Sequence, residues 1–265
     1  MRIPFFQVDA FTLKPFRGNP AAVCLPEREL PDELMLHIAA ENNLSETAFV
    51  IQSGDVFRIR WFTPVTEVPL CGHATLSSAH ILWAEEIVPP DEEIRFETRQ
   101  AGKLRIRREA GWIVMDLPAD IPQPVALPEA LEDILRAKVT AVFKTRFNGL
   151  LTLLESEPAV RQCIPDIAGM RRHGFDEVIV TAESGGEADF VSRFFAPGCG
   201  IDEDPVTGSA HCSLGAYWSG RLAKAEVLGH QVSRRGGFVR VRPRGERIDV
   251  MGQAVTVIRG HLHHE

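Results

Sequence analysis

The stretch FRIRWFTP at residues 57–64, followed by PLCGHA at 69–74, decides the fold because the chain contains this pattern twice. The second copy reads FVSRFFAP at 190–197 and PVTGSA at 205–210. Both copies fit F-x-x-R-(W/F)-F-(T/A)-P, a short gap and then P-x-x-G-x-A, and they lie about half of the 265 residues apart. A repeat of half the chain length indicates two similar lobes rather than one irregular domain.

Short strand-like segments and a few helical ones surround each copy. The sequence after each motif glycine predicts a helix, over 75–86 and over 209–222. Each lobe is therefore expected to be a mostly antiparallel sheet wrapped on a helix, which is an α+β fold.

A cluster of four prolines between residues 118 and 128 suggests where the two lobes meet in the sequence. Proline cannot sit in a helix interior or a central strand, so this segment is interpreted as the linker. We expect the first lobe over 1–117, joined by the last strand at about 254–265, and the second lobe over 118–253. The active site is expected in the cleft between them.

Composition places the chain among ordinary globular proteins, with 45% hydrophobic and 25% charged residues. The net charge of −7 argues against a nucleic-acid partner, because phosphate binding needs a basic face. A membrane partner is not expected either, since no apolar run approaches the roughly 20 residues of a membrane helix. The five cysteines are odd in number and form no C-x-x-C pair, so we expect a reducing, cytoplasmic location.

Gly72 and Gly208 each precede a predicted helix, at matched places in the two copies. A helix N-terminus carries unpaired N–H groups and a partial positive charge, and glycine lets a ligand approach the backbone. One such glycine would be explained by a tight turn alone. Two with matched flanks indicate a site for a carboxylate or phosphate.

Polar residues flank both glycines. His73 and Ser209 follow them directly, so His73 can donate to a substrate oxygen or relay a proton, while Ser209 has the common alternative role of a helix cap. Asp204 lies just before the second motif and can orient a histidine or bind a substrate amine. A carboxylate at this place also complements the helix dipole.

Glu46 stands at the start of an apolar strand, where partial burial would raise its pKa and make it a usable base. A solvated glutamate at the start of a strand explains the same residue equally well. Cys71 corresponds to Thr207 in the other copy, so a mechanism with two thiols is not available from these positions. Cys71 is expected to be a small buried residue.

Several short motifs together resemble the PhzF, or phenazine-biosynthesis-like, family. They occur in the family's order and span nearly the whole chain. They are D-A-F at 9–11, G-N-P at 18–20, N-L-S-E at 43–46, F-T-P at 62–64, C-G-H-A-T at 71–75 and E-D-P-x-T-G-S-A at 203–210.

This resemblance implies a diaminopimelate-epimerase-like fold, in which each lobe is a barrel-like sheet around a central helix. It also implies cofactor-independent acid–base chemistry, such as the isomerisation of trans-2,3-dihydro-3-hydroxyanthranilate. The catalytic residues that it implies are Glu46, His73 and Asp204. The residues expected to contact a small carboxylate substrate are Gly72, Thr207, Gly208, Ser209 and Asn19.

Two other functions remain open from the sequence. One is racemisation or epimerisation of an amino or hydroxy acid, with Glu46 and either Cys71 or His73 as opposed bases. The other is a binding protein without turnover. No metal and no cofactor are expected, because His73, His211 and the acids lack a recognised ligand spacing. We expect a homodimer, and His211 is noted as a second histidine near the motif that can alter which acid is accepted.

Overall fold

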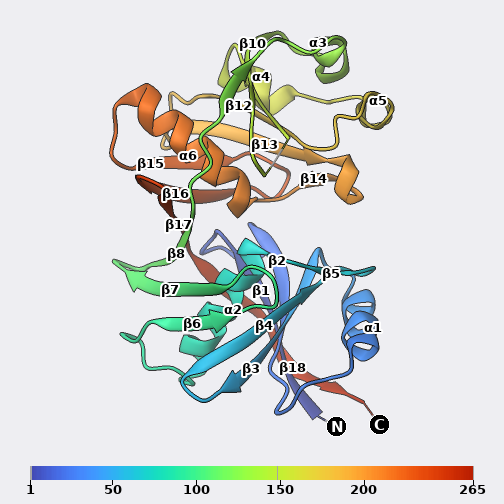
Figure 1. Cartoon of the computed structure of the whole chain (residues 1–265), viewed down its shortest axis with the longest axis vertical. Helices are drawn as coiled ribbons and strands as arrows, with labels where there is room; N and C mark the ends of the chain where they lie inside the picture. The colour runs from blue at the N-terminus through green and yellow to red at the C-terminus, as the bar shows by residue number, and fades with distance from the viewer. Residues whose placement is uncertain (1, 148, 265) are drawn as a thin grey trace. The chain divides into compact units, whose positions relative to one another are not determined.

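The computed structural model describes residues 2–147 and 149–264, and the chain forms two compact units. The first unit contains residues 1–116 and 251–265, and the second contains residues 117–250. Both combine a sheet with helices, as Figure 1 shows. The expected α+β class is confirmed by this architecture.

The first unit begins and ends in one sheet. Strand β1 is antiparallel to both β18 and β2, so the two ends of the chain lie side by side (Figure 1). Strand β3 is parallel to β2 and antiparallel to β4, which is in turn parallel to β6, and β7 and β8 continue antiparallel. The elements of this unit are β1 (Arg2–Ala10), β2 (Asn19–Cys24), α1 (Asp32–Asn42), β3 (Glu46–Ser53), β4 (Val56–Phe62), β5 (Glu67–Val68), α2 (Gly72–Ala84), β6 (Ile94–Glu97), β7 (Lys103–Glu109), β8 (Trp112–Pro118) and β18 (Ala254–His263).

The second unit repeats these pairings. Strand β10 is antiparallel to β9 and β11, β11 is parallel to β12, and β13 is antiparallel to β12 and β14 and parallel to β15. Its elements are β9 (Gln123–Val125), α3 (Leu131–Leu135), β10 (Val139–Lys144), β11 (Leu150–Leu154), α4 (Glu157–Gln162), α5 (Ile167–His173), β12 (Val178–Glu183), β13 (Phe190–Ala196), a 3₁₀ turn (Pro197–Cys199), β14 (Ile201–Asp204), α6 (Gly208–Leu222), β15 (Val227–Gln231), β16 (Gly237–Arg244) and β17 (Arg247–Gly252).

The internal repeat therefore extends far beyond the motifs that revealed it. Each of the pairings β1–β2, β2–β3, β3–β4, β4–β5 and β4–β6 has a counterpart of the same direction in β10–β11, β11–β12, β12–β13, β13–β14 and β13–β15. Helix α2 lies between β5 and β6 in sequence, and α6 between β14 and β15. The two motif helices thus occupy the same place in two copies of one topology.

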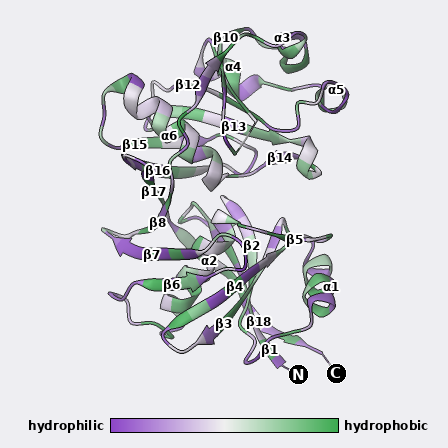
Figure 2. Ribbon diagram, viewed as in Figure 1, coloured by the Kyte–Doolittle hydropathy of each residue, from purple (hydrophilic) through white to green (hydrophobic). Residues whose placement is uncertain are grey.

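Helix α2 is the central element of the first unit. Its side chains are buried almost continuously from His73 to Trp83, and it contacts β1, β2, β3 and β18. A helix that is apolar all round must be covered on every side. In the second unit α6 contacts β15 and β16, and it approaches β16 so closely that a Cβ on Gly215 would lie 2.2 Å from a Val241 methyl carbon. Strand β7, unlike the apolar helix α2, is largely hydrophilic, as Figure 2 shows. Leu104 and Ile106 are its buried apolar residues.

The proline-rich segment differs from the linker that the sequence suggested. Residues 117–128 belong to the second unit, where β9 pairs with β10 through Gln123, Pro124 and Val125. Proline is tolerated here because β9 is short and exposed.

Both motif helices begin slightly earlier than predicted, at Gly72 and Gly208. The glycine itself is therefore the first helical residue. Across the described residues, no helix combines the length and the apolar character that crossing a membrane requires.

Candidate active site

His73 lies at the centre of a polar cluster in the first unit. It is the second residue of α2 and is 6% exposed. Asn19, the first residue of β2, places its Nδ2 3.3 Å from His73 Nδ1. Glu46, the first residue of β3, places its Oε2 3.2 Å from His73 Nε2. Because β2 and β3 are parallel neighbours, both strands begin at the same edge of the sheet, beside the start of α2.

These contacts define the protonation of His73. An amide nitrogen can only donate, so His73 Nδ1 accepts from Asn19 and the imidazole proton resides on Nε2. Nε2 lies 3.2 Å from Oε2 of the Glu46 carboxylate. Burial lowers the pKa of His73 to about 4, so the ring is neutral at neutral pH. The pair is therefore a carboxylate beside a neutral imidazole ring.

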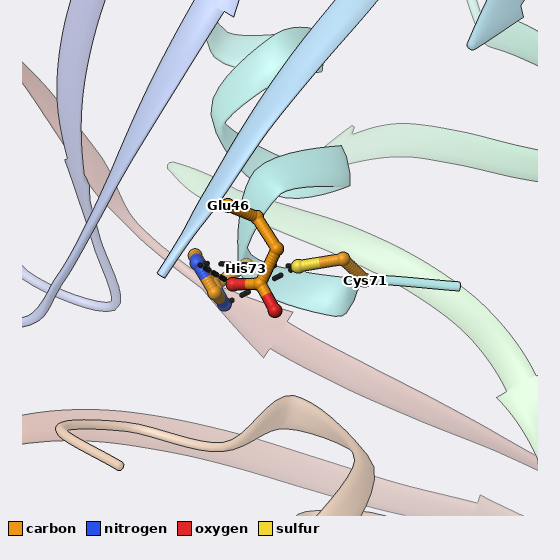
Figure 3. Close-up of side chains that lie close together, drawn as sticks. All are labelled: Glu46, Cys71 and His73. Carbon is orange, nitrogen blue, oxygen red and sulfur yellow. Dashed lines mark hydrogen bonds and ion pairs between the residues drawn. The ribbon is translucent and has the colours of Figure 1, made fainter. Parts of the chain in front are cut away.

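Cys71 completes this cluster, and Figure 3 shows its sulfur beside the Glu46 carboxylate and the His73 ring. Its Sγ lies 3.5 Å from His73 Nδ1 and 3.9 Å from Nε2. Cys71 is buried, as expected for a small core residue, but it faces the imidazole rather than an apolar neighbour. A carboxylate oxygen of Glu46, the sulfur of Cys71 and a ring nitrogen of His73 all lie within 4.8 Å of one another.

The two motif helices start in the same way. The residue before each helix is extended, Cys71 with φ −139° and Thr207 with φ −113°. The side chains of both residues form bonds other than a helix cap, Cys71 to His73 and Thr207 to Asp204. Since the first turns carry no acidic side chain in α2 or in α6, the backbone N–H groups keep their partial positive charge. Both glycines thus head the kind of helix end that binds anions.

The second unit holds the other predicted site residues around Thr207. Its hydroxyl donates to the buried carboxylate of Asp204, its N–H donates to Gln231 Oε1 at 2.9 Å, and Gln231 Nε2 donates to the Asp204 carbonyl at 2.8 Å. Gln231 is fully buried. Ser209 is half-buried at the second position of α6, which is the place that His73 takes in α2. Sequence reasoning did not include Gln231, which lies 24 residues beyond Thr207.

His211 supports this motif from within the core. It is fully buried, and its Nδ1 lies 2.8 Å from the Thr207 carbonyl oxygen, so Nδ1 carries the proton. Burial lowers the pKa of His211 to about 4, and its ring lies 5.9 Å from that of Phe190. In the first unit, Thr75 makes the corresponding hydrogen bond: its hydroxyl donates to the Cys71 carbonyl at 2.6 Å. His211 therefore fixes the backbone before α6.

A matched pair of ion pairs secures the strand before each motif, and sequence reasoning missed both. Arg60 Nε and Nη2 lie 2.8 and 2.7 Å from the two Glu67 oxygens. Arg193 Nε and Nη2 lie 2.7 and 2.9 Å from those of Glu203. Such two-point pairs fix both position and orientation. A signal was present in the sequence, since both glutamates stand five residues before the motif glycine.

The structure thus groups the predicted site residues by unit. Asn19, Glu46, Gly72 and His73 meet at the start of α2 in the first unit. The remaining predicted site residues gather at the start of α6 in the second unit, and they are Asp204, Thr207, Gly208 and Ser209.

Comparison with known proteins agrees with the motifs. Residues 8–260 match the family model described as phenazine biosynthesis-like protein, PhzC-PhzF. An uncharacterized isomerase of Pseudomonas aeruginosa is 51% identical over 262 residues, covering 99% of each chain. A PhzF-family crystal structure from Enterococcus faecalis covers 99% of this chain and 100% of its own, with 37% identity and a TM-score of 0.94.

A more distant comparison bears on the fold alone. A hydroxyproline epimerase from Agrobacterium vitis is 9% identical, with a TM-score of 0.64, and covers 98% of this chain and 92% of its own. The expected epimerase-like fold is therefore confirmed. Taken with the family match and the close relatives, it follows that the chain belongs to the phenazine-biosynthesis-like, or PhzF, family.

Proposed function

We propose that the protein is an isomerase that moves a proton on a small carboxylate substrate, with Glu46 as the general base. One observation carries this proposal: the Glu46 carboxylate is held 3.2 Å from the Nε2 of a buried, neutral His73. A neutral imidazole at this distance leaves the carboxylate its negative charge, so the carboxylate can accept a proton. The isomerase name of the Pseudomonas aeruginosa relative, at 51% identity, supports the same reaction class.

The reaction has no net gain or loss of atoms. Glu46 removes a proton from a substrate carbon, the electron pair shifts along the substrate, and the same carboxyl group returns the proton at another carbon. His73 stays neutral beside the Glu46 carboxylate, because burial lowers the pKa of its ring to about 4. The amide at Gly72 would hold a negative group of the substrate, which the start of a helix favours.

We assign the residues of the second motif to substrate binding. Asp204 and Ser209 would contact the polar groups of the substrate, and Gly208 would bind its carboxylate. Thr207 has its hydroxyl and its N–H engaged by Asp204 and Gln231, so its part is to keep Asp204 in position. Asn19 acts through His73, whose Nδ1 it contacts.

Racemisation is the second candidate function, because Cys71 is a possible base beside His73. It requires an opposed base on the other side of the substrate carbon. Thr207 stands at the place that corresponds to Cys71, and a hydroxyl that already donates to Asp204 does not supply a base at neutral pH. The geometry therefore favours proton transfer by Glu46 over a two-base exchange.

The test is a reaction in D₂O followed by NMR, first with trans-2,3-dihydro-3-hydroxyanthranilate and then with other small carboxylates. Isomerisation in which part of the carbon-bound proton is kept supports a single base on one face. Inversion at one carbon with full solvent deuterium would favour racemisation. Saturable ligand binding with no exchange at any carbon would leave a binding protein as the function.

A homodimer remains our prediction for the assembly. Light scattering on the purified protein checks it, and the mass of a single 29.4 kDa chain in solution would contradict it.

A further inference from the structure

Two side chains at the end of β15 and in the turn after it bind the backbone that carries Asp204. Gln231 donates to the Asp204 carbonyl at 2.8 Å and accepts from the Thr207 N–H at 2.9 Å. Ser233 donates its hydroxyl to the Pro205 carbonyl at 2.7 Å. Three backbone groups of the four-residue segment before α6 are therefore bound by these two side chains.

The turn that carries Ser233 is itself held on both sides. Before it, the Val232 N–H donates to the Ser192 carbonyl of β13 at 2.8 Å. After it, the Gly236 N–H donates to the Ser233 hydroxyl at 3.1 Å, and Gly236 has a φ of +66°, which glycine adopts without strain. The Ser233 oxygen thus accepts from its own turn while its proton goes to the segment before α6. Gln231 and Ser233 therefore contact that segment from a fixed position.

These contacts determine where the Asp204 side chain points. The Asp204 carboxylate is buried and accepts from the Thr207 hydroxyl. The carbonyl groups of Asp204 and of Pro205 are both held, and the proline ring fixes its own φ, so the backbone has little freedom to turn at this place. A displacement of about 1 Å in a reacting or orienting group can cost about 100-fold in rate. A contact that prevents such a displacement affects the reaction without touching the substrate.

The two copies of the repeat differ at this place. Gln231 lies beside Ser192 in the parallel pairing of β13 with β15. In the corresponding pairing of β4 with β6, that place falls on Thr98, the residue after Glu97. The Thr98 hydroxyl donates to the Gly102 carbonyl at 2.9 Å, so it bonds within the turn that leads to β7. Gln231 instead binds the motif, which shows that the second copy has its own means of fixing the start of its helix.

We propose that Gln231 and Ser233 are positioning residues of the reaction, which hold Asp204 and the start of α6 in the orientation that the substrate requires. The proposal rests on the proposed function, in which Asp204 contacts the substrate. A lost contact leaves every group that touches the substrate in the protein but lets Asp204 shift. The loss is therefore expected in kcat more than in KM.

Ser233→Ala tests the proposal, because it removes one contact and leaves the buried Gln231 in place. Turnover is followed by NMR in D₂O, beginning with trans-2,3-dihydro-3-hydroxyanthranilate and continuing with the other small carboxylates. We expect kcat to fall about tenfold or more while KM stays within about threefold of wild type. Ser233→Thr keeps the hydroxyl and should restore kcat to within about threefold of wild type.

Ser219→Ala is the matched control. The Ser219 hydroxyl donates to the Lys224 carbonyl near the end of α6, so the control loses the same kind of contact in the same unit, away from the motif. The urea midpoints of the two alanine variants should shift alike, and only Ser233→Ala should lose kcat. An unchanged kcat in Ser233→Ala, a rise in its KM alone, or an equal loss of kcat in Ser219→Ala would overturn the positioning role.

Hydrogen exchange of the Thr207 amide separates this proposal from the proposed function. Exchange should be about tenfold faster in Ser233→Ala and unchanged in Ser219→Ala, because only the first variant frees the segment before α6. Unchanged exchange in Ser233→Ala would overturn the inference whatever the activity. Faster exchange in a protein whose wild type turns over none of the carboxylates would instead refute the isomerase, and would leave the contact of Ser233 with the motif established.

Discussion

Replacing Gln231 by leucine is expected to loosen the motif before α6. Gln231 is fully buried and bridges two backbone groups, accepting from the Thr207 N–H at 2.9 Å and donating to the Asp204 carbonyl at 2.8 Å. Leucine fills a similar volume but leaves both groups without these partners. Each buried polar group that loses its partner costs about 1–3 kcal/mol, and burial of the apolar leucine side chain offsets part of that cost. We therefore expect the free energy of unfolding to fall by about 3 kcal/mol.

Two assays read this loss. Urea unfolding gives the change in free energy of unfolding, and hydrogen exchange by mass spectrometry reports the Thr207 amide itself. A loss of about 3 kcal/mol corresponds to roughly 100-fold faster exchange of that amide if it opens locally. Gln123→Leu is the control, because Gln123 is exposed in the same unit and its side chain donates to the nearby Ile121 carbonyl. A Gln231→Leu protein within 0.5 kcal/mol of wild type, with unchanged exchange, would refute the reasoning.

Two further predictions concern the same unit. Glu203→Gln should destabilise the protein by about 2 kcal/mol, because Arg193 is mostly buried and loses a partner that it contacts at two points. The control Asp202→Asn removes an exposed ion pair worth at most about 1 kcal/mol. Urea unfolding of both variants measures the two effects, and equal effects would contradict the prediction. His211→Gln should flatten the pH dependence of stability. The pKa of His211 falls from 6.5 to about 4 on folding, so the unfolded chain binds the extra proton and stability is lost as pH falls from 6.5 towards 4. The variant should lose about 1.4 kcal/mol per pH unit of that slope, and a slope that equals the wild-type slope between pH 4.5 and 6 would show that this histidine does not titrate as argued.

The sequence predicted the broad architecture well, for a physical reason. The repeat of FRIRWFTP and FVSRFFAP imposes similar strands at similar places, and the glycine before each apolar stretch marks a helix start. Burial of α2 on all sides follows from its apolar circumference. The proline-rich segment was interpreted less well, since local rules exclude proline from central strands but cannot show that β10 offers a free edge to β9.

The site was harder to predict, because its contacts depend on strand register. Glu46 meets His73 only because β2 and β3 are parallel and begin together, and no spacing in the sequence encodes that. The resemblance to the family, rather than the residue pattern, singled out Glu46. The role of Gln231 could not be predicted for the same reason, since this residue contacts Thr207 from the last position of β15.

The charge pairs show what a closer comparison of the two copies can add. Glu67 and Glu203 stand at the same distance from their glycines, and each meets the arginine of its own copy. Aligning the copies from the glycine backwards would have revealed them. Two-point pairs at the same place in both units indicate that both motifs need their strands held in one orientation.

The central claim is that Glu46 is the group that moves the proton, and Glu46→Gln tests it most directly. The assay follows proton exchange in D₂O by NMR, using the carboxylate that the wild type turns over, and compares wild type with Glu46→Gln and Glu41→Gln. Glu41 is an exposed glutamate near the end of α1, so Glu41→Gln serves as the control. The account predicts that Glu41→Gln matches wild type and that Glu46→Gln is slower by about 10²–10⁴, the range for loss of a general base. Exchange in Glu46→Gln within threefold of wild type would contradict the account.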